Sequence, residues 1–165
     1  VLATLRTKMI QLSEEIADGM VFANGVRSHM AASLSVLSKD ISNDFFIGDM
    51  IPTCISDDVE AAKAVNRKTL TSYVRLPNYR NYWKEAGYVE EMEGIEQALA
   101  DGDVDKVPHF LTDKWLADTT LFGSATAVRD GVEAWFDAGV KTPILVPSSV
   151  NGGQMVAFEE MLAIF

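Results

Sequence analysis

Two short segments near the start of the chain carry residue types that can bind a phosphate group. One reads LRTK and follows the apolar run at residues 1–4, and the other reads NGVR and follows the apolar run that begins at Met20. Each leads into a stretch with helical periodicity, so each is expected to end at a helix N-terminus, where free N–H groups and the helix dipole favour an anion. An Asn-Gly pair also allows a close approach of the backbone. The candidate phosphate-binding residues are Thr4, Leu5, Arg6, Asn24, Gly25 and Val26.

The simpler alternative is that both segments are ordinary connections between strands and helices, which need glycine and polar residues in any case. A third polar segment, SSVNGG, follows the last apolar run of the chain. In a parallel sheet it would lie on the same ligand-binding edge as the other two segments. It offers Ser148, Ser149 and Asn151 as candidate substrate-binding residues.

Catalytic triads and metal centres have no support in the sequence. His29 lies at an expected helix start, His109 has no evident partner, and the single cysteine, Cys54, lies in an apolar run that predicts a buried thiol. Metal-ligand spacing is absent, and so is a Gly-x-Ser-x-Gly turn. We therefore predict no catalytic residue and no metal ligand.

The charge of the chain argues against nucleic acids and acidic membranes as partners. The 165 residues have a formal net charge of −10, which opposes binding to a polyanion. Within residues 1–30, however, Arg6, Lys8 and Arg27 balance the acidic residues, so this segment is a suitable place for an anionic ligand. No run is long enough to span a membrane, and one cysteine is compatible with a reducing compartment. We expect a cytoplasmic protein that binds a small-molecule substrate.

The elements that must position these residues alternate between strand and helix. Continuous apolar runs predict strands at about 1–4, 20–24, 45–55 and 142–147, with a helical insertion at about 57–120. Strands that are apolar on both faces are typical of a parallel sheet covered by helices. Two architectures fit this order: an open doubly wound sheet, or part of a (β/α)₈ barrel.

Three details of these elements carry specific expectations. The apolar spacing at 7–17 predicts a helix that buries Met9, Leu12 and Ile16. Gly48 and Pro52 predict a bulge or an early end in the third strand. A helix at 125–138 is expected to follow the N-cap Ser124, to end before Gly139, and to bury Val128, Val132, Trp135 and Phe136.

Two longer motifs resemble the luciferase-like oxidoreductases, a family of flavin-dependent monooxygenases and coenzyme F420-dependent enzymes on a TIM barrel. The segment VLATLR followed by TKMIQLSEEIADGMVFANG resembles the fifth and sixth βα units of that barrel. The segment TLFGSATAVRDGVEAWFDAGVKTPILVP resembles the approach to its eighth strand, and YRNYWKEAGY resembles part of the insertion before that strand. The resemblance implies an α/β fold: the C-terminal half, or four βα units, of a luciferase-like TIM barrel with a helical insertion before the last strand.

The same resemblance implies FMN or coenzyme F420 as cofactor, with its phosphate at the first two loops. One departure bears on that site, because the family has Gly or Gly-Pro where this chain has Leu5-Arg6-Thr7. We expect a fragment of an oxidoreductase for hydride transfer or monooxygenation, inactive alone and completed by an N-terminal half. The alternative is a non-catalytic module that pairs with itself as a homodimer along its open sheet edges, or that binds flavin without turnover.

Overall fold

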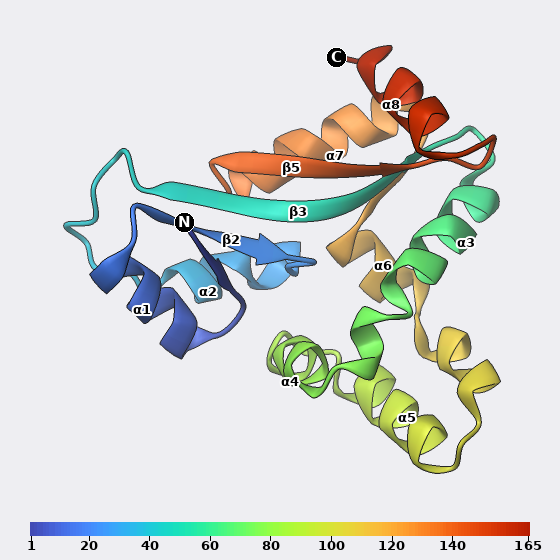
Figure 1. The fold of residues 1–165 in the computed structure, drawn as a ribbon, viewed down its shortest axis with the longest axis horizontal. Coiled ribbons are helices and arrows are strands. Elements are labelled where there is room, and N and C mark those ends of the chain that lie inside the picture. The colour runs from blue at the N-terminus through green and yellow to red at the C-terminus, as the bar shows by residue number, and fades with distance from the viewer.

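A computed structural model describes residues 1–165 and contains one parallel sheet (Figure 1). Its strands pair in the order β1-β2-β3, and β3 also pairs with both β4 and β5. All pairings are parallel, and β3 is the longest strand and the centre of the sheet. The strands are β1 (Leu2–Thr4), β2 (Gly19–Ala23), β3 (Phe46–Ile55), β4 (Leu121–Gly123) and β5 (Thr142–Ser148).

The strand β3 continues through Pro52 without a bulge, contrary to the sequence-based expectation. The Phe46 N–H donates to the Asp18 carbonyl, and the Met50 carbonyl accepts from the Asn24 N–H. The backbone N–H and C=O groups of the even-numbered residues of β3 therefore point toward β2. Pairing with β2 ends at Met50, and pairing with the short strand β4 begins only at Thr53. The backbone nitrogen of Pro52 therefore lies between the end of β2 and the start of β4. Because neither strand pairs with β3 at this position, the N–H that proline lacks costs the sheet no hydrogen bond.

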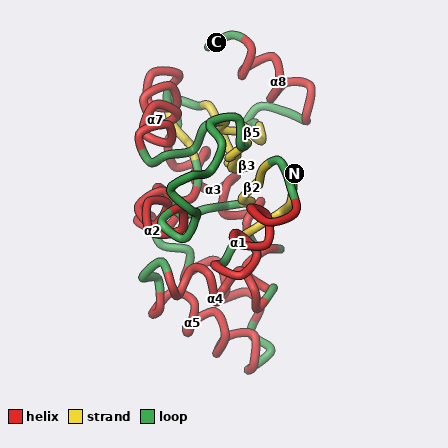
Figure 2. The backbone as a smooth tube through the Cα atoms, turned by 90° about the vertical axis from the view of Figure 1, so that its left-hand side faces the viewer, coloured by secondary structure: helices red, strands yellow, loops and turns green.

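One face of the sheet is covered by helices, which Figure 2 shows for α2 and α7 on the same side of the strands. The covering helices are α1 (Thr7–Ile16), α2 (Met30–Leu34) and α7 (Ala125–Asp137). Their contact with the strands forms a core that includes Ile10, Phe22, Met30, Ile51 and Trp135. The last helix, α8 (Gln154–Leu162), follows β5 and lies near the C-terminus at one end of the sheet (Figure 1).

The buried face of α1 differs from the expected one. Ile10 and Ser13 are buried, whereas Met9, Leu12 and Ile16 are exposed, Ile16 by 67%. The reason is the position of α1 beside β1, an edge strand, so that only the side of the helix that faces β1 and β2 meets the sheet. Phe136 on α7 is likewise exposed rather than buried, although Val128, Val132 and Trp135 are in the core.

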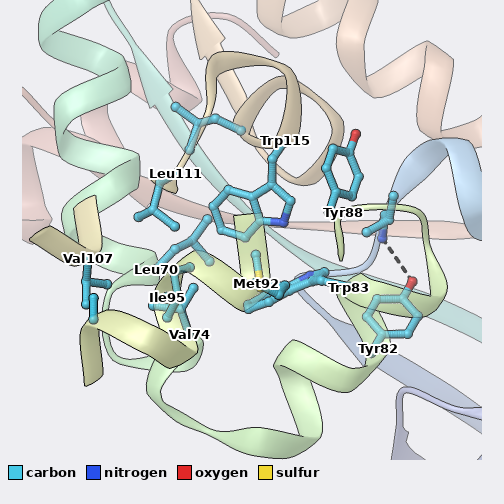
Figure 3. Packing of buried hydrophobic residues seen from close by; sticks show 13 residues of the cluster. Leu70, Val74, Tyr82, Trp83, Tyr88, Met92, Ile95, Val107, Leu111 and Trp115 are labelled. Carbon is cyan, nitrogen blue, oxygen red and sulfur yellow. Dashed lines mark hydrogen bonds between the residues drawn. The ribbon is translucent and has the colours of Figure 1, made fainter. Parts of the chain in front are cut away.

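The helical insertion between β3 and β4 has a hydrophobic core of its own, shown in Figure 3. Trp83 and Trp115 meet edge to face at its centre, with their ring centroids 4.9 Å apart. Asp58 and Thr112 cap two of its helices through their side chains. The insertion consists of α3 (Val59–Leu70), α4 (Pro77–Glu85), α5 (Val89–Ala100) and α6 (Asp113–Thr119), with 3₁₀ turns η2 (Tyr73–Arg75) and η3 (Val104–Phe110).

The strands β1, β5 and the short β4 each pair on one side only, and the second face of the sheet has little cover. Met50 points to the face opposite Ile51 and is 40% exposed, and Ala3 is also exposed. Helix α8 leaves Met155, Phe158 and Leu162 in solvent. No helix combines the length and the apolar character needed to cross a membrane.

Candidate functional site

A cavity of about 250 Å³ lies at the carboxyl ends of β1 and β2, beneath the start of α4. In a parallel sheet this edge is where ligands bind, because the loops leading to the helices converge there. Three of the residues proposed from the sequence, Thr4, Leu5 and Arg6, are in its wall. The other lining residues are Ala3, Met9, Ala23, Asn78 and Tyr79.

Thr4 lines this first cavity, but its side chain is buried: the residue is 3% exposed, and its Oγ1 has no hydrogen-bond partner within the protein. The strand register places Thr4 beside the buried Phe22, whereas Ala3 and Ala23 alternate to the other face of the sheet. The feature of the wall that suits an anion is the N-terminus of α1, which has no side-chain cap and no acidic residue in its first turn. Its free N–H groups therefore remain available to a phosphate.

Arg6 is already paired with a carboxylate of the helical insertion. Its Nε donates to Glu85 Oε1 at 2.8 Å, and its Nη2 contacts the same oxygen. The hydrogen bond to Glu85 raises the pKa of the Arg6 guanidinium above its ordinary value. Arg6 and Leu5 also line a second cavity of about 250 Å³, whose wall includes His29, Tyr82 and Glu85. These two side chains thus separate two adjacent cavities.

The loop after β2 is built differently from the loop after β1. Asn24 takes the left-handed conformation, with φ of 58°. A side chain at position 25 would be crowded, because a Cβ added to Gly25 would lie 3.0 Å from both Asp49 Oδ2 and Met30 Cε. The Gly25 N–H donates to Asp49 Oδ1 at 3.1 Å, and the Val26 N–H donates to Tyr82 Oη at 3.0 Å. These two donors are satisfied within the protein, and neither residue lines the cavities beside Arg6.

A buried carboxyl, Asp49, lies under this loop in the middle of β3. Burial raises the pKa of Asp49 to about 7, although hydrogen bonds from the backbone of Gly25 and Met50 oppose that shift. Its Oδ2 and the nearby loop's Asn24 Nδ2 have no hydrogen-bond partner within the protein. The sequence analysis did not select Asp49, although an acid inside the apolar run FIGDMIPTCI was a visible signal.

Two of the three candidate substrate residues lie at another cavity. Ser148 and Ser149 line a space of about 440 Å³ between β5, α3 and the start of α8, and this space shares no residue with the cavities beside Arg6. Glu160 Oε1 accepts hydrogen bonds from Ser149 Oγ and Asn151 Nδ2, both at 3.0 Å. The structure therefore places Ser149 and Asn151 in a local hydrogen-bond network with α8, separate from Thr4, Leu5 and Arg6.

The helical insertion supplies residues that the sequence analysis did not assign to the site. Tyr79 and Asn78 line the first cavity, and Glu85 holds Arg6. Within the segment NYRNYW, Tyr82 and Trp83 pack in the core of the insertion. Trp83 also reaches the β2 loop, because its Nε1 donates to the Asn24 carbonyl at 3.2 Å.

Comparison with known proteins shows the family to which this chain belongs. The family model described as luciferase-like monooxygenase matches residues 1–142, which is most of the chain. The chain belongs to the luciferase-like monooxygenase family. No curated protein matches it. The loop with free N–H groups and the helical insertion above it are thus features of a member of this family.

A solved structure with the same arrangement is the coenzyme F420-dependent tetrahydromethanopterin reductase from Methanopyrus kandleri. The two structures superpose with a TM-score of 0.70 at 17% sequence identity, a likeness of fold. The match covers 89% of this chain and 44% of the reductase, so the chain spans less than half of that protein's length. The fold is therefore that of the C-terminal half of a luciferase-like TIM barrel, with a helical insertion before the last strand, as expected from the sequence.

Proposed function

We propose that this luciferase-like chain forms the C-terminal half of the site of a flavin- or F420-dependent oxidoreductase and holds the cofactor's phosphate beside Arg6. The observation that carries the proposal is the first cavity, where the uncapped start of α1 and Arg6 meet. Both offer donors suited to an anionic oxygen. The cofactor named for the similar reductase is coenzyme F420, and the family model is that of a monooxygenase.

In this proposal the residues of the chain bind and orient rather than react. Arg6 and the N–H groups at the start of α1 hold the phosphate. Tyr79 and Ala23 line the apolar side of the same cavity, which suits the uncharged part of a ligand. A bound flavin or deazaflavin supplies hydride transfer or oxygen activation. Residues 1–165 alone bind without turnover, since the exposed Met50 and Ala3 leave the inner face of the sheet open to water.

Titration of the chain with FMN, riboflavin and coenzyme F420, followed by fluorescence, tests this proposal. Riboflavin lacks the phosphate of FMN, so the difference between the two isolates the phosphate contact. Arg6→Gln is expected to weaken FMN binding by about tenfold, the order expected for a lost charge-assisted hydrogen bond, and to leave riboflavin unchanged. Arg129→Gln, a surface arginine on α7, is the matched control. Equal binding of FMN by the wild type and Arg6→Gln would contradict the phosphate assignment.

A second candidate function is a non-catalytic module that pairs along its open edges, and the exposed face of α1 favours it. Met9, Leu12 and Ile16 form an apolar stripe next to the edge strand β1. Exposed apolar stripes beside an unpaired edge are normally covered by another chain or segment. The partner would be a second copy of this chain or the N-terminal half of a barrel. Light scattering at low concentration distinguishes these cases, because only self-pairing gives a dimer in the purified chain.

A further inference from the structure

A third region of the molecule combines a cavity with uncompensated positive charge. The cavity has a volume of about 380 Å³ and lies where the β2 loop meets the helical insertion. Three segments form its wall: the 3₁₀ turn η1 (Arg27–His29), the turn between α4 and α5, and helix α6. It shares no lining residue with the two cavities beside Arg6.

The charged side chains of this wall do not cancel one another. Arg27 and Lys114 line the cavity, and neither is in an ion pair with a carboxylate. The one acidic residue of the wall is Asp118. Two cations against one carboxylate leave the cavity with an excess positive charge, in a chain whose formal net charge is −10. An anion is therefore the ligand that this wall would attract.

The carboxylate of Asp118 is occupied by the protein, which leaves the two cations free to meet a ligand. Ser28 donates to Asp118 through its backbone N–H at 3.0 Å and its Oγ at 2.5 Å, and Tyr88 Oη donates at 2.7 Å. Figure 3 shows the Tyr88 hydroxyl directed away from the packed tryptophans. Burial, followed by the bond to Asp118, raises the pKa of Tyr88, so its hydroxyl keeps its proton and remains a donor.

The same three hydrogen bonds hold the floor of the cavity in place. They tie the β2 loop and the α4–α5 turn to α6, so Arg27 and Lys114 approach the space from opposite elements. The Lys114 Nζ lies 5.6 Å from the centre of the Tyr88 ring, a cation–π distance that restrains the ammonium over the cavity. The volume is near the lower end of the range for ligand sites, which suits a small anion.

We propose that this cavity is a second anion site, in which Arg27 and Lys114 bind a small phosphate or carboxylate group. The site goes beyond the proposed function and does not depend on Arg6. Both ligand types present paired oxygens to a guanidinium and an ammonium, which is the chemistry the wall recognises.

Binding of inorganic phosphate and of succinate to the Arg6→Gln chain tests the proposal, because that background removes the contact proposed for the cofactor's phosphate. Amide NMR shifts of Ser28 and Gly87 report binding, with sodium chloride at equal ionic strength as reference. We expect saturable shifts with at least one of the two anions, and the identity of that anion names the ligand class. Arg27→Gln with Lys114→Gln is expected to weaken binding by at least about tenfold. Lys39→Gln and Arg129→Gln are matched controls that keep full affinity.

Three outcomes would overturn the site. One is a response to chloride equal to that for phosphate and succinate, which would mean general screening. Another is the absence of saturable shifts at Ser28 and Gly87. The third is unchanged affinity in the double variant while its thermal unfolding midpoint matches that of the parent chain. None of these outcomes bears on FMN binding to the chain that retains Arg6, so the two proposals fail separately.

Discussion

The hydroxyl of Tyr82 accepts a hydrogen bond from the backbone N–H of Val26 at 3.0 Å. This bond joins the helical insertion to the loop after β2, across 56 residues of sequence. Both groups are buried, and burial raises the pKa of Tyr82 to about 12, so the hydroxyl stays protonated. The insertion therefore acts as part of the candidate site by occupying a backbone donor that a ligand could otherwise have used.

Tyr82→Phe is expected to lower the free energy of unfolding by about 1–3 kcal/mol, because it leaves the buried Val26 N–H without an acceptor. Urea denaturation followed by circular dichroism measures the change. Tyr79→Phe is the control, since Tyr79 is half-buried and its hydroxyl makes no hydrogen bond to the protein. A loss of equal size in both variants would mean that the Val26 bond contributes nothing of its own.

Asp49 is expected to make the protein less stable as the pH rises from about 4 to about 7. The pKa of Asp49 is raised by burial from 3.8 to about 7, so the folded state keeps its proton at pH values where the unfolded state has lost it. Over that window this one group lowers the free energy of unfolding by up to about 1.4 kcal/mol per pH unit, and above pH 7 the decline stops.

Asp49→Asn removes this contribution, so the stability of the variant relative to the wild type should increase across the same pH window. Denaturant titrations at a series of pH values measure the difference, which cancels the effects of the other acids. Asp44→Asn, at an exposed carboxylate just before the same strand, is the control. A relative stability that stays constant with pH would show that Asp49 is ionised in the folded state.

Gly19→Ala is expected to destabilise the fold by about 1–3 kcal/mol or more, as overpacking does in tight interiors. An added Cβ would lie 2.4 Å from Phe46 Cβ and 2.6 Å from the Phe46 carbonyl oxygen, and the backbone of a paired strand cannot easily yield. Gly153→Ala is the matched control, because nothing lies within 4 Å of its added Cβ. Thermal unfolding midpoints of the two variants should differ clearly, and equal midpoints would mean that β2 and β3 separate at little cost.

Leu12→Lys combined with Ile16→Lys is expected to weaken any association through α1 by roughly 10- to 100-fold, because two exposed apolar side chains would lose their burial in the complex. Analytical ultracentrifugation of the purified chain measures self-association, and the same variant can be tested against a separately expressed N-terminal half-barrel. Val104→Lys alters an exposed apolar residue of the insertion instead. Assembly that tolerates the α1 changes as well as this control would place the interface elsewhere.

The local elements near the site were largely predictable from short-range patterns. Ser124 Oγ accepts the Ala127 N–H as an N-cap, and Gly139 ends the same helix with φ of 102°. The short strand β4 was not predicted, since its three residues are too few to give a periodic signal. The uninterrupted course of β3 was not predictable either, because the tolerance for Pro52 depends on where the neighbouring strands stop.

The candidate site likewise contains residues that a local pattern could identify and residues whose roles depend on distant contacts. The loop after β1 could be selected because a short apolar run followed by a helix start is a local pattern, and Thr4, Leu5 and Arg6 line a common cavity. The roles of Gly25 and Val26 could not be foreseen, because their N–H groups are satisfied by Asp49 and Tyr82, which are distant in the chain.

The alternation of apolar strands and amphipathic helices, and with it a parallel βα architecture, can be read from the sequence, because both follow from the order and period of neighbouring residues. The family came instead from the resemblance of two longer motifs to the luciferase-like oxidoreductases. Which face of a helix is buried depends on packing, as the exposed Leu12 and Ile16 show. Packing also sets which polar groups remain free for a ligand. The pairing of Arg6 with Glu85 joins residues 79 positions apart, and contacts of that range depend on how the elements pack rather than on any local pattern.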